Sequence, residues 1–198
     1  MKTYRNKPMK KGFTVWLTGY SGAGKTTISQ QLQLRMLERN IASEILDGDI
    51  VRQNLCKDLG FSKEDRCTNI LRIGFVAEML SRHGVCVIVS AISPYRDTRN
   101  SIREKIANFV EVYVNCPIEV CESRDVKGLY KKARNGEMTN FTGISDAYEE
   151  PIDPEIICDT EAETIEESVN KIIAGLEKLN LIRPSCLIPA SPAKTPQI

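Results

Sequence analysis

The chain has 198 residues, with 41% hydrophobic and 27% charged side chains and a formal net charge of +1. This length and composition are typical of one globular domain with a substantial core. The balanced charge gives no reason to expect nucleic acid or a membrane as a partner, and no apolar run approaches the ~20 residues that a membrane span needs. The basic first residues lack the apolar centre of a secretory signal.

Strand-like and helix-like patterns alternate along the chain. The strand-like runs cover 14–18, 42–47, 85–91, 109–115 and 155–159. The helix-like runs cover 25–40, 49–56, 64–82, 97–108 and 163–179. Such alternation favours an α/β fold, a central parallel sheet with helices on both faces. We expect one domain over 1–180, with an irregular charged segment over about 124–150 and a flexible, Pro/Ser-rich tail over 181–198.

The cysteines and the single histidine do not indicate a metal site. Seven cysteines form no C-x-x-C pair and the chain has one histidine, so no zinc constellation is available. An odd cysteine count without a signal segment favours reduced thiols and a cytoplasmic protein. Cys86 and Cys116 lie in apolar strand-like runs, where they are expected to be small buried hydrophobic residues.

A glycine-rich turn, GYSGAGKTT, joins the first strand to the first helix. It completes the pattern G-x-x-x-x-G-K-[ST] of the P-loop, in the strand–loop–helix context that this motif requires. Loop N–H groups and the helix N-terminus bind phosphate, Lys25 is expected to reach the β- and γ-phosphates, and the Thr26 hydroxyl is expected to bind Mg²⁺. The expected nucleotide-binding residues are Gly19, Ser21, Gly22, Ala23, Gly24, Lys25, Thr26 and Thr27.

Two acids, Asp47 and Asp49, follow the second strand in the stretch LDGDIVR. They are expected at the carboxyl edge of the sheet, where α/β proteins bind ligands. A carboxylate there can orient a substrate hydroxyl and accept its proton during phosphoryl transfer. The alternative is a plain strand-to-helix turn with an Asp cap.

The stretch SKED, at 62–65, is the nearest match to the guanine-reading motif of GTP switch proteins. It begins with Ser62 and opens a helix, with Asp65 at the third helical position, so we interpret it as a helix cap. This position argues against a GTP switch.

The irregular segment over about 124–150 is expected to be a mobile lid. It holds Arg124, Lys127, Lys131, Lys132 and Arg134. A kinase must keep water from the transferred phosphate, and a closing basic lid does so while neutralising charge. The alternative is a solvated charged loop.

Seven segments resemble signatures of the adenylylsulfate kinase (APS kinase) family, in the same order, between about residues 11 and 180. They are GYSGAGKTT, LDGDIVR, LGFSKEDRCTNILRIG, SAISPYRDTR, VYVNCPIEVCESRDVKGLYKKAR, NFTGI and YEEPIDPE. The P-loop alone names only a superfamily, whereas the combination is far more specific. The resemblance implies a P-loop kinase in which ATP phosphorylates the ribose 3′-hydroxyl of adenosine 5′-phosphosulfate (APS), giving 3′-phosphoadenosine 5′-phosphosulfate (PAPS) and ADP. It also implies Mg²⁺, a homodimer and a role in sulfate assimilation beside a separate ATP sulfurylase, with which the chain would be functionally coupled.

The resemblance also implies roles for single residues. Asp49 would hold the 3′-hydroxyl and accept its proton, while Asp47 would support Mg²⁺. Arg52 and Arg66 would clamp the phosphosulfate, because planar guanidinium groups suit tetrahedral anions; ordinary surface salt bridges are the alternative. Asn69 shares a helix face with Arg66 and would meet the same ligand.

Phe61 and Phe141 resemble two aromatic residues that enclose the APS adenine. Core packing is the alternative for Phe61, whereas Phe141 stands in a polar segment and is not expected in a core. Ile92 and Ser93 would contact the substrate, and Ser93 would either donate a hydrogen bond or carry a transient phosphate.

Lys127 resembles a lid lysine near the transferred phosphate, and Arg124 resembles a residue that covers the ATP adenine. The expected catalytic residues are therefore Lys25, Asp49, Ser93 and Lys127.

Several positions depart from the family pattern. Ile50 replaces a usual Asn, and Thr68, Leu71 and Phe75 replace polar or charged residues; we interpret Leu71 and Phe75 as altered packing at a subunit contact. Two other functions stay open. One is another P-loop kinase, acting on a sugar, shikimate or a nucleotide, and the other is a nucleotide-binding regulatory protein that has lost catalysis.

Overall fold

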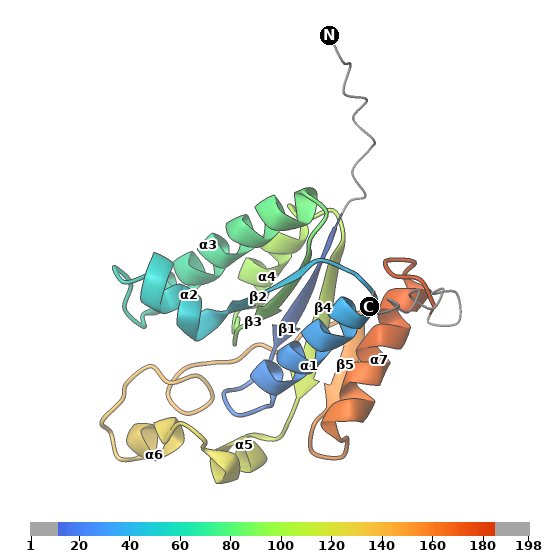
Figure 1. Ribbon diagram of the computed structural model, residues 1–198. Helices are drawn as coiled ribbons and strands as arrows, with labels where there is room; N and C mark the ends of the chain where they lie inside the picture. The colour runs from blue at the N-terminus through green and yellow to red at the C-terminus, as the bar shows by residue number, and fades with distance from the viewer. Residues whose placement is uncertain (1–11, 185–198) are drawn as a thin grey trace, which may run out of the picture.

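The computed structural model describes residues 12–184, which form a five-stranded parallel sheet with helices on both faces (Figure 1). The strands are β1 (Phe13–Thr18), β2 (Ser43–Asp47), β3 (Cys86–Ser90), β4 (Phe109–Asn115) and β5 (Ile156–Asp159). The helices are α1 (Lys25–Glu38), α2 (Gly48–Leu55), α3 (Lys63–Arg82), α4 (Arg96–Arg103), α5 (Ile118–Arg124), α6 (Leu129–Arg134) and α7 (Ile165–Lys178). The strand order is β2-β3-β1-β4-β5, which confirms the expected α/β class.

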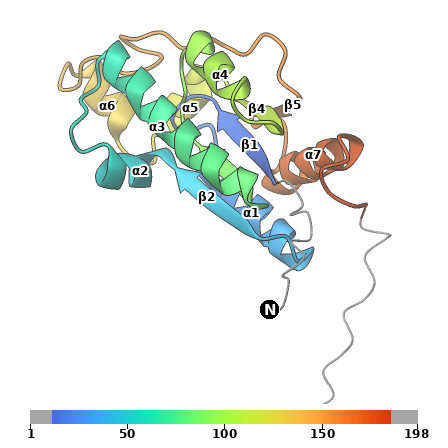
Figure 2. The same cartoon turned by 90° about the horizontal axis from the view of Figure 1, so that it is seen from above.

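The two faces of the sheet carry separate hydrophobic cores. Helices α1 and α7 cover one face, and α3 and α4 cover the other (Figures 1 and 2). Strand β1 supplies both cores, because Val15 and Leu17 join the α1/α7 side while Trp16 joins the α3/α4 side. A strand buried on both faces carries consecutive apolar residues instead of alternating ones, as Val15, Trp16 and Leu17 do.

Helix caps fix where the helices beside the sheet edge begin. Asp47 ends β2 and caps α2, since its Oδ1 accepts hydrogen bonds from the N–H groups of Asp49 at 3.0 Å and Ile50 at 3.3 Å. Ser62 caps α3 through a hydrogen bond from the Asp65 N–H to its hydroxyl, at 3.1 Å. The expected Ser62 cap is therefore confirmed, and both helices start close to their expected positions.

Three features differ from the sequence prediction: the end of one helix, an additional helix and the end of the folded part. Helix α4 ends at Arg103 and not at 108; Asn108 precedes β4, and its carbonyl accepts from the Thr14 N–H at 2.8 Å. The segment over 124–150 contains a short helix, α6. Ile182 packs in the α1/α7 core, so the folded part extends past residue 180. The remainder of the expected tail, 185–198, and residues 1–11 of the expected domain lie outside the described residues.

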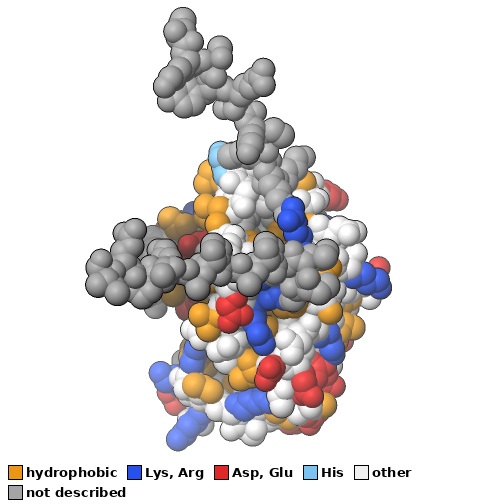
Figure 3. All heavy atoms as spheres, turned by 45° about the vertical axis from the view of Figure 1, so that its right-hand side comes forward, with side chains coloured by type: hydrophobic (Ala, Val, Ile, Leu, Met, Phe, Trp, Pro, Cys, Tyr) orange, Lys and Arg blue, Asp and Glu red, His pale blue; other side chains and the backbone are white. Residues whose placement is uncertain are grey.

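The surface and the cysteines agree with the balanced composition. Basic and acidic side chains are interspersed on the face that Figure 3 displays. Over residues 12–184, no helix has the combined length and apolarity to cross a bilayer. The six cysteines of this range are free thiols, and burial raises the pKa of Cys86 to about 12.

Candidate active site

The P-loop connects the carboxyl end of the central strand β1 to α1, at the carboxyl edge of the sheet (Figure 1). Gly22 has a φ of 79°, and a Cβ there would meet the Cys121 carbonyl oxygen at 3.0 Å. Gly24 has a φ of 96° and is the N-cap of α1, so the helix begins directly at Lys25. Both positions need the backbone freedom of glycine. The result is a tight turn whose N–H groups and helix terminus form an anion-binding geometry.

Lys25 is buried inside this turn. Its Nζ donates to the carbonyl oxygens of Gly19 at 2.8 Å and Tyr20 at 2.6 Å. Burial lowers the pKa of Lys25 to about 8, an effect that the nearby carboxylates of Asp49 and Asp47 oppose. A buried ammonium group favours a nearby anion, because attraction to the anion offsets the free-energy cost of removing the cation from water.

Asp47 lies next to the P-loop as well as capping α2. The Thr26 hydroxyl donates to Asp47 Oδ2 at 3.3 Å. Asp47 therefore caps α2 through one oxygen, as the alternative of an Asp-capped turn expected, and contacts Thr26 through the other. One carboxylate and one hydroxyl are a sparse set, which matches Mg²⁺, a metal that keeps waters and phosphate oxygens as its other ligands.

Asp49 is ion-paired with Lys127, and both side chains are mostly exposed. Asp49 comes from the start of α2, whereas Lys127 comes from the turn between α5 and α6. The pair therefore joins the lid segment, 124–150, to the sheet edge beside the P-loop. The structure thus brings together two of the four residues expected to be catalytic.

Arg52, Phe61 and Arg66 form a second cluster between α2 and α3. The Phe61 ring is 55% exposed, so the alternative of core packing for this residue is wrong. The Cζ of Arg52 lies 4.6 Å from the ring centroid, and that of Arg66 lies 5.7 Å from it. An exposed aromatic ring beside two guanidinium groups offers stacking and positive charge to one ligand.

Arg66 is also bound to the lid segment. Its Nη1 donates to the Thr142 hydroxyl at 2.9 Å, its Nη2 donates to the Asn140 carbonyl, and its Nε lies 3.4 Å from Asp146 Oδ2. Burial lowers the pKa of Arg66. These contacts are more than the surface salt bridge that was the alternative for Arg66, because they fix the guanidinium to the lid.

Phe141 is buried, contrary to expectation. It is 6% exposed and packs edge-on against Tyr130 of α6, with the ring centroids 5.0 Å apart. The residues next to Phe141 in the sequence are polar and do not indicate this contact. Its apolar partner, Tyr130, lies eleven positions earlier, on α6. Phe141 thus anchors the lid to the α1/α7 core.

Ser93 does not face the open edge of the sheet, and its expected catalytic role does not fit the structure. The residue is 1% exposed with a φ of 49°, and its hydroxyl accepts a hydrogen bond from Trp16 Nε1 at 3.0 Å. This positive φ turns the side chain toward the α3/α4 core. In this conformation the hydroxyl is buried beside Trp16.

Ile92 and Asn69, both expected to contact the substrate, lie after β3 and on α3. The Ile92 carbonyl accepts from the Thr18 hydroxyl at 2.7 Å, which ties the end of β3 to the end of β1. Asn69 is buried on α3, and its Oδ1 has no hydrogen-bond partner in the described part of the chain. A buried acceptor without a partner is costly, so this oxygen is a candidate contact for a ligand.

The remaining lid cations have different surroundings. Arg124 donates through Nη2 to the Thr160 carbonyl at 2.7 Å, close to the start of α1, because the Thr160 hydroxyl bonds the Ala23 carbonyl at 2.9 Å. Arg134 is paired with Glu122 at 2.9 Å, and Lys131 and Lys132 are exposed. The side chains of these last three residues are solvated, as the alternative expected, but they stand on helix α6 and not in a loop.

Sequence reasoning missed Tyr20, Arg99 and Tyr148. Arg99 is buried and donates to the Glu111 carboxylate, the Ser93 carbonyl and the Glu149 carbonyl at 2.6–2.7 Å. Tyr148 bonds the Thr18 hydroxyl at 2.9 Å, next to the P-loop. Their only sequence signal is membership of the segments SAISPYRDTR and YEEPIDPE, while Tyr20 occupies an unspecified position of the P-loop motif.

Known proteins resemble this chain over most of its length. A family model described as adenylylsulphate kinase matches residues 11–159. An adenylyl-sulfate kinase of Rippkaea orientalis is 64% identical over 173 residues, which is 87% of this chain and 96% of the relative. An adenylyl-sulfate kinase of Halothermothrix orenii is 54% identical over 87% of this chain and 94% of the relative.

Solved structures agree with these relatives. The APS kinase of Mycobacterium tuberculosis, solved in complex with AMPPNP and APS, has a TM-score of 0.81 and 41% identity, covering 84% of this chain and 98% of that one. A gluconokinase of Sinorhizobium meliloti, at 18% identity, covers 86% of this chain and 94% of its own with a TM-score of 0.56, and shares the fold alone. Both the family model and the similar relatives point to one family, and the residues that the structure gathers around the P-loop, Asp49 and Arg66 agree with them. This chain belongs to the adenylylsulphate kinase family.

Proposed function

We propose that the chain transfers the γ-phosphoryl group of ATP to the 3′-hydroxyl of APS, giving PAPS and ADP. The observation that carries the proposal is the position of Asp49, whose carboxylate acts on the buried Lys25 of the P-loop and stands on α2 together with Arg52, a member of the cluster with Phe61 and Arg66. A phosphoryl donor on one side and an anionic nucleotide on the other would meet at this acid. The relatives named adenylyl-sulfate kinase, and the M. tuberculosis enzyme that binds AMPPNP and APS, support the choice of substrates.

ATP would occupy the P-loop, with its phosphates on the loop N–H groups of residues 19–27 and on Lys25. Arg124 lies at the other side of the α1 N-terminus and would cover the adenine. Thr26 and Asp47 would hold Mg²⁺ through one hydroxyl and one carboxylate oxygen. A Mg²⁺ ion held by these two residues would offset the negative charge of the phosphates during transfer.

APS would bind against α3 and the lid. The exposed Phe61 ring would stack on its adenine, and Arg52 and Arg66 would bind its phosphosulfate. The unpartnered Asn69 Oδ1 would accept a hydrogen bond from the same ligand. Phe141, buried against Tyr130, would act on the site only by holding the lid segment in place, and Ile92 would close the site at the end of β3.

The chemistry needs one proton acceptor and two cations. Asp49 accepts the proton of the 3′-hydroxyl while the oxygen forms a bond to the γ-phosphorus. The bond between that phosphorus and the β,γ-bridging oxygen breaks, and ADP leaves with the bond electrons. Lys25 and Lys127 stabilise the charge on the transferred group. Lys127 must exchange its partner Asp49 for the phosphoryl oxygens during this step.

The lid segment is proposed to open and close. Its contacts to the rest of the domain include the exposed ion pair of Lys127 with Asp49 and the hydrogen bonds of the mostly buried Arg66 to Asn140 and Thr142. The Lys127–Asp49 pair can be exchanged for substrate contacts at little cost, because exposed ion pairs contribute about 0–1 kcal/mol. Closure would exclude water and so suppress ATP hydrolysis.

A coupled ADP-release assay tests this function. With Mg²⁺ and ATP we expect rapid ADP release on addition of APS, and only background with AMP, gluconate or shikimate as acceptors. A 3′-phosphorylated product after a single turnover with APS would separate catalysis from nucleotide binding alone. Stimulation by another acceptor, with none by APS, would favour another P-loop kinase; ATP binding without any product would favour a regulatory protein.

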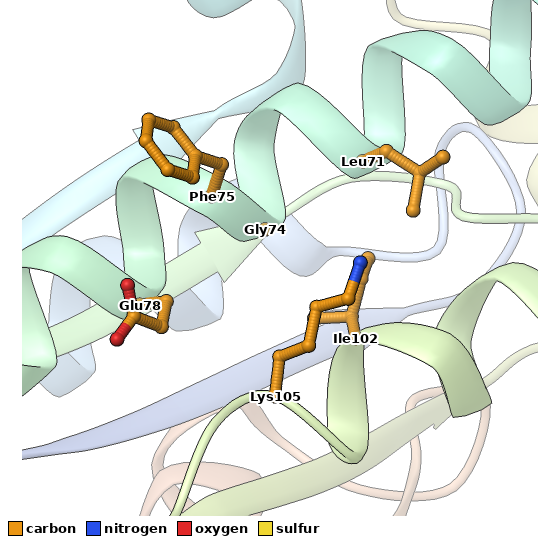
Figure 4. A pocket seen from close by; sticks show the side chains of 6 residues that line it. All are labelled: Leu71, Gly74, Phe75, Glu78, Ile102 and Lys105. Carbon is orange, nitrogen blue, oxygen red and sulfur yellow. The ribbon is translucent and has the colours of Figure 1, made fainter.

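A homodimer is proposed through the outer side of α3. A groove of about 320 Å³ is lined by Leu71, Gly74, Phe75, Glu78, Ile102 and Lys105. Figure 4 shows Leu71, Gly74 and Phe75 on α3 and Ile102 and Lys105 on the neighbouring segment, with the Phe75 ring pointing away from Lys105. Phe75 is 64% exposed, and a second groove shares Leu71 and Phe75. Glu78 and Lys105 stand at the rim, so a twofold copy would bring acid opposite base around an apolar centre.

The setting in the cell is a proposal of the same kind. The free thiols over residues 12–184 support a reducing, cytoplasmic compartment. APS is a mixed anhydride of sulfate and a nucleotide, so a separate ATP sulfurylase would supply it, and the product would serve sulfate assimilation. The hexameric APS kinase of Thiobacillus denitrificans is 35% identical, covering 88% of this chain and 30% of that one, with a TM-score of 0.67.

A further inference from the structure

Tyr20 is a P-loop residue whose side chain belongs to the lid. Its ring centroid lies 4.8 Å from that of Tyr148, with an angle of 45° between the planes. On another side, a Cβ added at Gly143 would lie 2.8 Å from Tyr20 Cε1, so the backbone of Gly143 rests on the ring. The ring is thus in contact with two lid residues that are five positions apart.

The backbone of Tyr20 belongs to the phosphate-binding turn. Its carbonyl oxygen accepts from Lys25 Nζ at 2.6 Å and from the Ala23 N–H at 3.2 Å. An anion that binds Lys25 therefore acts on a side chain that is bonded directly to the Tyr20 backbone. Tyr20 consequently contacts the phosphate lysine through its main chain and the lid through its side chain.

The part of the lid that Tyr20 contacts also carries residues of the proposed APS site. Gly143 follows Thr142, which holds the guanidinium of Arg66, and Phe141 precedes both. The Gly143 N–H donates to the Asp146 carbonyl at 2.7 Å, and the Asp146 carboxylate lies beside Arg66. A displacement of Gly143 would therefore also move Phe141, Thr142 and Asp146. Of these, Thr142 and Asp146 contact Arg66.

Tyr148 fixes the other end of this segment. Its hydroxyl bonds Thr18, the residue before the P-loop, at 2.9 Å. The next residue, Glu149, is held by the buried Arg99 through its carbonyl at 2.7 Å and by the Arg96 N–H through its carboxylate at 2.8 Å. The end of the lid is thus rigid, and the ring of Tyr20 lies between this anchor and Gly143.

We propose that Tyr20 couples occupancy of the P-loop by ATP to the affinity of the lid for APS; the inference rests on the proposed function. Phosphates on the loop N–H groups immobilise residues 19–24, and with them the ring that supports Gly143. The ordering cost is then borne by the first ligand, so the second binds more tightly. Couplings of this kind commonly change affinity about 5–150-fold, and they act equally in both directions. Tyr20 is a positioning residue, since it needs no contact with either ligand through its side chain.

Calorimetric titration with APS tests this coupling, in the presence and absence of saturating AMPPNP and Mg²⁺. For the wild-type protein we expect AMPPNP to tighten APS binding at least about fivefold. For Tyr20→Ala the ratio of the two affinities should fall below about twofold, while APS affinity without AMPPNP changes little. Tyr20→Phe is the matched control and should keep the wild-type ratio, because it retains both the ring and the carbonyl.

A second variant guards against unfolding of Tyr20→Ala. Tyr148→Leu removes the ring from the lid side, and it should lower the same ratio; the double variant should lower it no further than either single one. Equal ratios in the wild type and both single variants would overturn the coupling, as would a wild-type ratio of one. Failure of the wild-type protein to bind APS at all would instead overturn the proposed function, and the inference with it.

Discussion

Lys127 of the lid is ion-paired with Asp49, the carboxylate at the carboxyl edge of the sheet beside the P-loop. The pair links two segments 78 residues apart through side chains that are mostly exposed. In a nucleotide-free protein it neutralises both partners. A phosphoryl group that enters between them would take Lys127 as its own counter-ion and leave Asp49 free to accept a proton.

The first prediction concerns Asp49 as the proton acceptor. Asp49→Asn keeps the shape of the side chain and removes its basicity, so we expect kcat to fall about 10²–10⁴-fold. ATP affinity should change less than about threefold, because phosphate binding relies on the P-loop. Asp58→Asn, which alters an exposed carboxylate paired with Arg72, is the matched control. An unchanged kcat in Asp49→Asn would remove the residue from the proton transfer.

Lys127 is predicted to act in the transition state. Lys127→Met removes a charge that the transferred group would meet only when Asp49 has released it, so kcat should fall about 10–10³-fold with a smaller change in the KM for ATP. Lys132→Met removes an exposed lysine of α6 and should leave both constants unchanged. A loss confined to KM would show that Lys127 contributes only to substrate binding.

The pH dependence of ATP binding is predicted from Lys25. Burial lowers the pKa of Lys25 to about 8, and bound phosphates favour its charged form. Below that pH the ammonium is present and affinity should be constant; above it the free protein loses the proton, so affinity should fall roughly three- to tenfold per pH unit. Titration of ATP with Mg²⁺ and no acceptor measures this. Lys25→Met should bind weakly at every pH, and a flat wild-type profile through about pH 9.5 would contradict the assignment.

Asp146 is predicted to position Arg66 for the acceptor. It lies 3.4 Å from Arg66 Nε and accepts a hydrogen bond from the Tyr95 hydroxyl at 2.7 Å. Asp146→Asn keeps the Tyr95 bond but removes the charge, so the KM for APS should rise about threefold to tenfold, the scale of a partly exposed charged contact. The KM for ATP should not change. A parallel rise in both KM values would indicate general disorder of the lid instead.

Much of the fold could be predicted because the sequence signals are local. The apolar run of β1 indicates a strand covered on both faces, and Asp47 and Ser62 mark the starts of α2 and α3 through their own caps. The P-loop, the two acids and the paired arginines are also short patterns. Helix α6 is an exception, since a helix of six residues carries too little periodicity to be recognised.

The parts that could not be predicted depend on contacts between distant segments. The burial of Phe141 requires Tyr130, and the inward turn of Ser93 requires a positive φ together with Trp16, 77 residues away. Neither is visible in the residues around them. Ser93 follows an apolar strand and looks like a ligand residue, whereas its carbonyl and hydroxyl in fact hold Arg99 and Trp16 in place.

The last prediction concerns the outer side of α3. Leu71 and Phe75 are one helical turn apart, and a homodimer through them would bury an apolar patch that water otherwise surrounds. Phe75→Arg puts a charge at the twofold centre, where it would face its own copy, so we expect dissociation to a monomer by size-exclusion chromatography with light scattering. Leu37→Arg is the matched control, because Leu37 is 54% exposed on α1, over the opposite face of the sheet. A wild-type monomer, or a dimer that Phe75→Arg leaves intact, would place any subunit contact elsewhere; loss of dimer in both variants would point to general destabilisation, which a thermal melt of each separates.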